Sequence, residues 1–271
     1  MEQTFDLYRD IAERTDGDVY IGVVGPVRTG KSTLISRMME ELVLNGMTPG
    51  PKRDRIADEL PQSGSGKTIM TTQPKFVPSE AVSVSLGDQA TVRVRMVDSV
   101  GYLVEGALGT EEDGTARMVH TPWYDYDIPF EQAAEIGTRK VIADHATIGL
   151  VVTTDGSIAD LPREAYAAPE ERVVRELKQL GKPFIMILNS RTPDAESTQR
   201  MRDTLSQRYA VPVLALNAKE VGMDDILGVF EQVLFQFPLR EIQVSVPGWV
   251  HALDESHWLV QHVLEGVRNG A

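Results

Sequence analysis

The residues with the clearest chemical pattern are Gly25–Ser32, which read GPVRTGKS. Their spacing fits G-x-x-x-x-G-K-[ST], a loop whose backbone N–H groups surround the phosphates of a nucleotide. Gly25 and Gly30 allow the backbone to curl inward, and the N-terminus of a following helix adds partial positive charge. We therefore expect Lys31 to bridge the β- and γ-phosphates and the Ser32 hydroxyl to ligate Mg²⁺.

The sequence on both sides of this loop provides the structural context that the motif requires. Residues 19–24 are apolar and β-branched, which predicts a buried strand. Between Ser32 and Leu44 the apolar residues recur at helical spacing. A chance glycine-rich loop is the alternative, but it would not explain the correct flanks. Thr33, directly after the motif, is also expected to contact the nucleotide.

A second candidate site residue is Asp98, which ends a predicted strand and begins Asp-x-x-Gly. Next to a phosphate loop, such an aspartate holds Mg²⁺ through water, and the N–H of the glycine, here Gly101, can meet the γ-phosphate. A simple turn aspartate is the alternative. Tyr102 follows at the position where Ras-like GTPases have a water-orienting glutamine. Hydrolysis by this chain must therefore be organised differently.

The segment between these two motifs predicts a switch loop. Thr71 and Thr72 are its best candidates for closing over Mg²⁺ and the γ-phosphate, although they could be ordinary β-forming threonines. Ser63–Thr68 superficially suggests a second phosphate loop. That reading fails because Pro61 stands where the first glycine is required and no apolar strand precedes it.

The predicted base-recognition segment departs from the pattern of GTPases. Asn189 occupies the asparagine position of an Asn-Lys-x-Asp motif, but Ser190 replaces its lysine and Thr192 its aspartate. Without the carboxylate that accepts hydrogen bonds from guanine, discrimination for GTP is lost, so ATP is the expected nucleotide. Ala218 and Lys219 match the loop that completes the base pocket. A GTPase with a decayed base motif is the alternative.

Arg28 lies in the middle of the phosphate loop and is a candidate for an additional catalytic role. Enzymes of this broad class stabilise transition-state charge with an arginine supplied in cis or in trans, or with a monovalent cation. Tyr102 cannot supply that charge. The alternatives for Arg28 are exposure to solvent or pairing with Asp58 or Glu59.

Composition restricts the possible partners. The 271-residue chain has a net charge of −13 and a pI near 4.9, which argues against a broad nucleic-acid or anionic-membrane surface, although local basic patches remain possible. It has no cysteine, in keeping with a reducing cytosol. Residues 1–6 lack the features of a signal peptide, and no apolar run reaches transmembrane length. We expect a cytoplasmic protein without a transmembrane segment.

The order of the predicted elements indicates an α/β fold. Strands alternate with helices, which favours a mainly parallel sheet with helices on both faces, and a hairpin near residues 87–88 adds one antiparallel strand. Residues 45–80 and 99–129 are expected to be long loops. Within the second loop, the aromatic cluster Trp123, Tyr124 and Tyr126 suggests a partner contact or local packing. The predicted strands are residues 19–24, 81–86, 91–97, 147–153, 183–188 and 211–216, and the predicted helices are residues 1–16, 32–44, 130–144, 169–180, 194–209 and 224–236.

The pattern changes after residue 238. A further strand is predicted at 242–246 and a helix at 255–268. We interpret residues 1–238 as one P-loop domain and residues 239–271 as the beginning of another.

Several unusual stretches resemble the stage IV sporulation protein A family of spore-coat morphogenetic ATPases. This resemblance implies a P-loop NTPase of the translation-factor-like GTPase type that uses ATP and Mg²⁺. Lys31 then falls on the phosphate-loop lysine of the family, Asp98 on its Mg²⁺ aspartate, and Thr71 and Thr72 on its paired sensor threonines. The stretches that carry the resemblance are residues 10–15 with the phosphate loop, 58–63, 66–72, 121–124, 134–140 and 257–259.

The resemblance also implies a biological role. Family members use ATP hydrolysis to assemble a static shell on the mother-cell side of the outer forespore membrane. Their middle and C-terminal domains follow the ATPase domain, so residues 239–271 would begin a middle domain, and self-association would require the C-terminal part. The implied partners are other copies of the chain, other spore-coat proteins and a small membrane-bound anchoring peptide. A scaffold that binds nucleotide with little turnover is the alternative.

Overall fold

The computed structural model describes residues 15–61, 74–86, 90–106, 111–112, 115–121, 123–237, 253–254 and 256–270. The chain divides into two compact units, Met1–Gln236 and Phe237–Ala271. The expectations for residues 1–14 of the helix at 1–16, the hairpin turn at 87–88, the strand at 242–246 and the switch-loop residues Thr71 and Thr72 lie outside the described residues. Thr15 and Asp16 lie in a turn and not in a helix.

The first unit is built on a six-stranded sheet in the order β10-β9-β8-β1-β3-β2. All neighbouring strands are parallel except β2 and β3, which pair antiparallel at one edge. This arrangement confirms the predicted α/β class with one antiparallel strand. The strands are β1 (Asp18–Val24), β2 (Lys75–Leu86), β3 (Ala90–Asp98), β8 (Ile148–Thr154), β9 (Phe184–Asn189) and β10 (Val213–Leu216).

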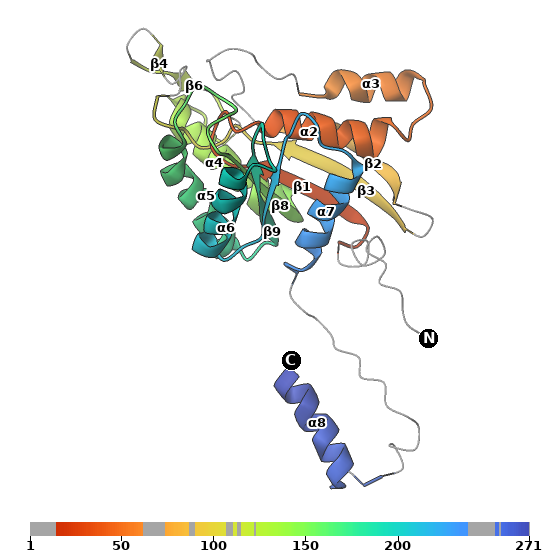
Figure 1. Cartoon of the computed structure of the whole chain (residues 1–271). Helices are drawn as coiled ribbons and strands as arrows, with labels where there is room; N and C mark the ends of the chain where they lie inside the picture. Colours follow the sequence, from red (N-terminus) through yellow and green to blue (C-terminus); the bar gives the residue numbers. More distant parts are fainter. Residues whose placement is uncertain are drawn as a thin grey trace. The chain divides into compact units, whose positions relative to one another are not determined.

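Helices cover both faces of this sheet, as expected. On one face, α4, α5 and α6 pack with the strands around a shared apolar cluster that includes Val141, Leu177 and Leu205. On the other, α2 contacts β1 and β3, and α7 contacts β9. Figure 1 shows α4, α5 and α6 grouped together, away from α2 and α3. The helices are α2 (Lys31–Met39), α3 (Pro51–Glu59), α4 (Phe130–His145), α5 (Ala167–Leu180), α6 (Glu196–Tyr209) and α7 (Met223–Leu234).

The central strands explain why the functional loops gather at one edge. Every residue of β8 and of β9 is buried, as the continuous apolar runs in the sequence predict for strands covered on both faces. Because β1, β3, β8, β9 and β10 are parallel, their carboxyl ends lie at the same edge of the sheet. The loops after them are therefore brought together.

The structure corrects the two long loops predicted from the sequence. Residues 45–80 contain α3, which begins with Pro51 at its first position, and β2 begins already at Lys75. Only Ile56 of α3 is buried, so the helix shows no apolar periodicity. Residues 99–129 contain two-residue strands that are too short to produce a sequence signal: β4 (Glu111–Glu112), β5 (Thr115–Ala116), β6 (Met118–Val119) and β7 (Ile128–Pro129).

Two further helical segments flank the main helices. The predicted helix at 32–44 is α2 continued by one π-helical segment, Glu40–Leu44. A short 3₁₀ helix, Arg163–Tyr166, precedes α5. In the second unit, the helix predicted at 255–268 is observed as α8 (Trp258–Gly270). None of the helices in the described part of the chain has the length and apolarity that crossing a membrane requires.

Candidate nucleotide-binding site

The loop Gly25–Ser32 follows β1 directly, and its last two residues, Lys31 and Ser32, begin α2. Gly25 has φ 138°, and a Cβ there would lie 2.2 Å from the carbonyl oxygen of Val152. Gly30 has φ 92°, and a Cβ there would lie 2.3 Å from the side-chain nitrogen of Asn189. Both positions combine a positive φ with close neighbours, so only glycine fits. The backbone of this loop therefore packs closely against the carboxyl-terminal ends of β8 and β9.

Lys31 is buried inside this loop, with 5% of its surface exposed. Its ammonium donates hydrogen bonds to the carbonyl oxygens of Pro26 at 2.7 Å and Gly25 at 3.4 Å. Burial lowers the pKa of Lys31 to about 8, although the charge of Asp98 opposes the shift. The lysine is thus a desolvated cation bound by neutral carbonyl groups, which favours interaction with an incoming anion.

Asp98 ends β3 beside the N-terminus of α2. One of its oxygens, Oδ2, accepts a hydrogen bond from the Ser32 hydroxyl at 2.7 Å. The other, Oδ1, is buried and has no hydrogen-bond partner among the described residues. Burial raises the pKa of the Asp98 carboxyl, and the Ser32 hydrogen bond and the positive charges of Lys31 and Lys75 oppose the rise.

A hydroxyl and a carboxylate oxygen in this arrangement fit a Mg²⁺ site. Mg²⁺ bound with a nucleotide uses one or two protein oxygens together with phosphate oxygens and water, rather than a cage of carboxylates. Ser32 Oγ and the unpartnered Asp98 Oδ1 are oxygen ligands of the required type. Within the described ranges, no group of three or more His, Asp or Glu side chains could hold a metal.

Gly101 and Tyr102 join the Asp-x-x-Gly segment to the phosphate loop. A Cβ on Gly101, which has φ 95°, would lie 2.5 Å from both the Gly25 carbonyl oxygen and the Lys31 ammonium. The backbone of Tyr102 donates to the Gly25 carbonyl at 3.1 Å and accepts from the Val27 N–H at 2.8 Å. These contacts keep the Asp-x-x-Gly backbone directly against the lysine.

The side chain of Tyr102 points away from the site. Its hydroxyl donates to Glu176 of α5, and its ring lies 5.1 Å from the guanidinium carbon of Arg172. Only 2% of the residue is exposed. Burial, together with the Glu176 carboxylate, raises the pKa of Tyr102 far above its ordinary value, so the phenol stays neutral. Tyr102 therefore stabilises the packing of α5 and is not placed to orient a water molecule.

Asn189, at the end of β9, connects three loops of the site. Its side-chain NH₂ group donates to the Thr29 carbonyl at 2.9 Å, and its side-chain oxygen accepts from the Ala218 N–H at 3.0 Å. Asn189 and Ala218 are both buried, at 2% and 1% exposure. Lys219 is exposed, and its backbone N–H donates to the Asn217 side chain at 3.2 Å. The structure thus brings the phosphate loop and both base-loop candidates together.

The residues that replace the GTPase lysine and aspartate have different environments. Ser190 is fully buried, and its hydroxyl donates to Asp155 at 2.5 Å and accepts from the Thr192 N–H at 3.0 Å. The Thr192 side chain lies on the exposed surface. Asp155 also accepts from the N–H and hydroxyl of Ser157, at 2.9 and 2.6 Å. The Ser190 hydroxyl and the Asp155 carboxylate therefore find their hydrogen-bond partners within this segment and the loop after β8.

Sequence reasoning missed the role of Asp155 in this segment. Burial acts to raise the pKa of Asp155, but its hydrogen bonds with Ser157 and Ser190 outweigh burial and lower it, so the carboxylate is charged at neutral pH. The signal that could have identified it is the run Asp155–Ser157 directly after a buried strand, because an aspartate there commonly accepts from the N–H two residues on.

The remaining predicted residues are placed as follows. Arg28 is partly exposed and has a left-handed φ of 64°. It lies close enough to Tyr166 for its charge to oppose the rise in the Tyr166 pKa that burial causes. The carboxylate of Glu59, one possible Arg28 partner, accepts from the Ser79 N–H and hydroxyl. Thr33 is partly exposed in the first turn of α2.

The fold and the site together define a P-loop NTPase: a strand–glycine loop–helix unit lies beside an Asp-x-x-Gly segment at the end of the adjacent parallel strand. Within this class, residues 1–238 match the family model described as "Stage IV sporulation protein A, ATPase domain". The chain belongs to this sporulation protein family. The family match confirms the resemblance inferred from the sequence.

Individual relatives agree with this assignment. The chain is 53% identical over 259 residues to stage IV sporulation protein A of Clostridioides difficile (strain 630), a match that covers 96% of this chain and 53% of the relative. It is 52% identical over 263 residues to the Bacillus subtilis (strain 168) protein of the same name, covering 97% and 54%. The chain spans about half the length of these curated relatives.

A more distant similarity connects the chain to GTPases. Over 201 residues it is 25% identical to GTPase Der of Mycobacterium avium (strain 104), a match that covers 65% of this chain and 42% of that protein. The similarity supports a nucleotide-hydrolase family and the P-loop NTPase fold.

Proposed function

We propose that this chain is a slow, Mg²⁺-dependent ATPase whose turnover drives assembly of the spore-coat basement layer. The observation that carries the proposal is the buried Lys31 ammonium beside an Asp98 carboxylate with one unpartnered buried oxygen. A buried ammonium whose hydrogen bonds go only to neutral carbonyl groups and a buried carboxylate oxygen without a hydrogen bond match the charges of a phosphate chain and its metal ion.

Each residue of the site has a proposed role. Lys31 would neutralise the β- and γ-phosphates, and the N–H groups of Gly25–Ser32 and Gly101 would surround them. Ser32 and Asp98 would hold Mg²⁺, directly or through water. The bound Mg²⁺–ATP supplies the phosphoryl group to be transferred and the metal charge that stabilises the reaction.

Water activation would require other groups, because Tyr102 is committed to α5. We propose that Thr71 and Thr72 of the switch loop position the attacking water, and that Thr71 also contacts Mg²⁺. Arg28 would add charge over the β–γ bridge from its position in the phosphate loop. Slow intrinsic turnover agrees with the lack of a glutamine after Gly101.

ATP is the proposed nucleotide because the base segment has no carboxylate for guanine. Thr192 replaces that carboxylate, and Ser190 is buried and bonded to Asp155. Asn189, Ala218 and Lys219 would line the base pocket. The alternative is a GTPase with an altered base motif. Two observations favour this alternative. Asn189 is retained and its side chain bonds both the Thr29 carbonyl and the Ala218 N–H, an arrangement that we call the Asn189 clamp. The chain is also similar to GTPase Der.

The proposed cellular role follows from family membership. The chain would act in the cytoplasm on the mother-cell side of the outer forespore membrane and associate with other copies, with spore-coat proteins and with a small membrane-bound anchoring peptide. Residues 239–271 would begin a middle domain, and polymerisation would require the C-terminal part of the family's domain plan. No nucleic-acid partner is proposed for a chain of net charge −13.

Phosphate release with ATP and with GTP, measured side by side with and without Mg²⁺, tests the enzymatic proposal. We expect slow release with ATP that depends on Mg²⁺, and little with GTP. Faster release with GTP would support the altered GTPase instead. Tight binding of either nucleotide without release above the Lys31→Ala background would support a nucleotide-binding scaffold.

A further inference from the structure

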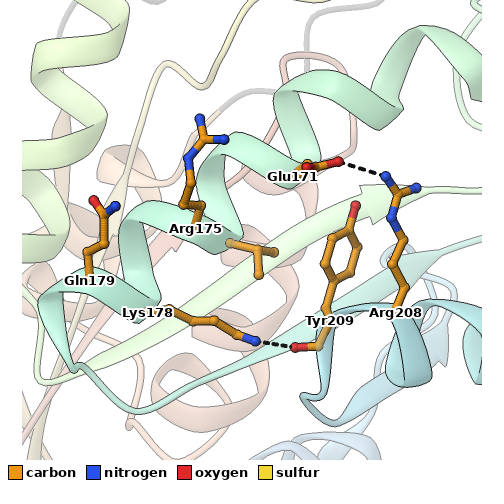
Figure 2. A pocket seen from close by; sticks show the side chains of 7 residues that line it. Glu171, Arg175, Lys178, Gln179, Arg208 and Tyr209 are labelled. Atoms are coloured by element: carbon orange, nitrogen blue, oxygen red, sulfur yellow. Dashed lines mark hydrogen bonds and ion pairs between the residues drawn. The ribbon is translucent and has the colours of Figure 1, made fainter.

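An open groove lies between α5 and α6. Its volume is about 470 Å³, within the roughly 300–1,000 Å³ typical of ligand sites. Its apolar lining residues are the buried Val174 and Tyr209, which we call its base. The side chains of Arg175, Lys178 and Arg208 also line it (Figure 2). The groove is thus a positively charged site on a chain whose net charge is −13.

The three cations differ in how far they are already neutralised. Arg208 pairs with Glu171 at 2.7 Å, and Lys178 donates to the backbone carbonyl of Tyr209. Arg175 has neither a hydrogen bond nor an ion pair with any residue that the structure describes, and it is exposed. Arg175 and Lys178 therefore carry positive charge that no carboxylate beside the groove balances.

The base of the groove is held in place from below. The Tyr209 hydroxyl donates to the fully buried Glu170 at 2.9 Å, and Glu170 also pairs with Arg163 at 2.8 Å. These buried bonds fix the tyrosine ring, so little ordering would be needed when a partner binds. Arginine and lysine stems along the sides add apolar surface that an aromatic ring could contact.

The same chain carries an exposed segment of opposite charge. Tyr126 is 63% exposed, and Asp125 and Asp127 on either side of it are exposed as well. The Tyr126 ring lies 5.3 Å from the ring of Tyr124, and Asp127 lies 3.4 Å from His120. A solvent-exposed aromatic residue between two carboxylates is the chemistry that a cationic groove with an apolar base recognises.

We propose that the groove between α5 and α6 binds the Asp125–Asp127 segment of a second copy of this chain. Tyr126 would enter beside Val174 and Tyr209, and its flanking carboxylates would pair with Arg175 and Lys178. The two surfaces are different, so the contact is head-to-tail. It would be a weak lateral contact that adds to the polymerisation for which the C-terminal part is proposed to be required. The contact rests on the proposed association between copies and is independent of the proposed hydrolysis.

Binding of a fluorescent peptide with the sequence of residues 120–130 to the full 271-residue chain tests this contact directly. We expect saturable binding that weakens at least about fivefold for Arg175→Glu, since the substitution replaces an attraction by a repulsion. Arg200→Glu makes the same charge change on α6 outside the groove and should bind the peptide like the unchanged chain. A peptide with Tyr126→Ala should bind weakly.

Charge exchange between copies tests the contact in the whole chain. Sedimentation velocity at increasing concentration should show a weak, reversible association of the unchanged chain, well short of the polymer for which the C-terminal part is proposed to be required, and less of it for Arg175→Glu alone and for Asp125→Arg alone. Mixing the two variants should restore association, since the groove of one then matches the segment of the other.

The inference is overturned if the peptide does not bind, if Arg200→Glu and Arg175→Glu weaken it equally, or if mixing restores nothing. ATP turnover of Arg175→Glu, measured in parallel, should equal that of the unchanged chain. This control separates failure of the proposed contact from failure of the proposed hydrolysis.

Discussion

The proposed nucleotide site has a phosphate side, formed by the loop Gly25–Ser32 and Gly101, and a base side, formed by Asn189–Thr192 with Ala218 and Lys219. The two sides are built differently. On the phosphate side, Gly25, Gly30 and Gly101 adopt positive φ and leave no room for a Cβ, and Lys31 is buried among backbone carbonyls. On the proposed base side, recognition would depend on individual side chains: Asn189 is retained, while Ser190 bonds to Asp155.

The difference shows which part of the site can change without loss of the fold. Backbone geometry recognises a phosphate chain in any nucleotide, so a substitution there affects every nucleotide equally. The lysine and aspartate positions of the base motif are occupied here by small polar residues that satisfy their own hydrogen bonds. Nucleotide choice can therefore change while the phosphate side is preserved.

The largest effect is expected for Lys31→Ala. Turnover should fall by at least about a hundredfold with ATP and GTP alike, because the phosphates lose their fixed counter-charge, in the range known for removal of one transition-state contact. Steady-state phosphate release measures the loss. A variant that loses turnover with only one of the two nucleotides would contradict the division between the two sides.

Asp98→Ala should remove Mg²⁺-dependent turnover by a similar factor, about a hundredfold, while much of the ATP affinity remains. The reason is that, in the proposed site, the Ser32–Asp98 pair would provide the metal ligands, whereas Lys31 and backbone N–H groups would provide most of the phosphate binding. Mg²⁺ titrations of turnover measure the effect. Superimposable titrations for the variant and the unchanged chain would show that Asp98 has another role.

Asn189→Ala tests whether the Asn189 clamp supports phosphate binding as well as base binding. Removing it leaves the Thr29 carbonyl and the Ala218 N–H without their partner, at a cost of about 1–3 kcal/mol in the free energy of unfolding. Affinity for ATP and GTP should fall together, because the clamp positions the phosphate loop. Denaturant unfolding and competition binding measure the two effects, and unchanged stability would refute the clamp.

The double change Ser190→Lys with Thr192→Asp should alter only the base side. We expect a shift of about tenfold toward GTP in competition binding, by analogy with a bidentate base contact of about 1–3 kcal/mol. The lysine would also meet the Asp155 carboxylate, now paired with Ser190. Adding Asp155→Asn to the double variant is the matched control and should reduce the gain. No shift at all would place the base elsewhere.

The smallest effect concerns pH. The pKa of Lys31 in the free protein is lowered to about 8, and bound phosphate raises it again because negative charge favours the ammonium. Below pH 8 the lysine is charged in both states and affinity is constant. Above pH 8 binding requires uptake of a proton, so ATP affinity should fall about threefold between pH 7.5 and 8.5. Calorimetry in buffers of different ionisation enthalpy should detect this proton uptake at pH 8.5, and its absence would contradict the buried cation.

Strong local patterns made most of the sheet predictable from sequence. The fully buried strands β8 and β9 appear as continuous apolar runs, and the phosphate-loop motif identifies the strand before it and the helix after it. Helix α3 was missed because a single buried residue, Ile56, gives no periodicity. The two-residue strands between residues 111 and 129 have no length over which a period could show.

The sequence by itself determined the residue types of the site, its order along the chain and its family, because each depends on short segments with fixed spacing. Only the tertiary structure decided which distant residues meet. It turned Tyr102 onto α5 and bound Ser190 to Asp155, although 35 positions separate the last two. It also placed Arg175 and Lys178 of α5 beside Tyr209 of α6. These contacts form because polar groups pair with partners on other helices and strands. The spacing of residues along the chain does not reveal which partners meet.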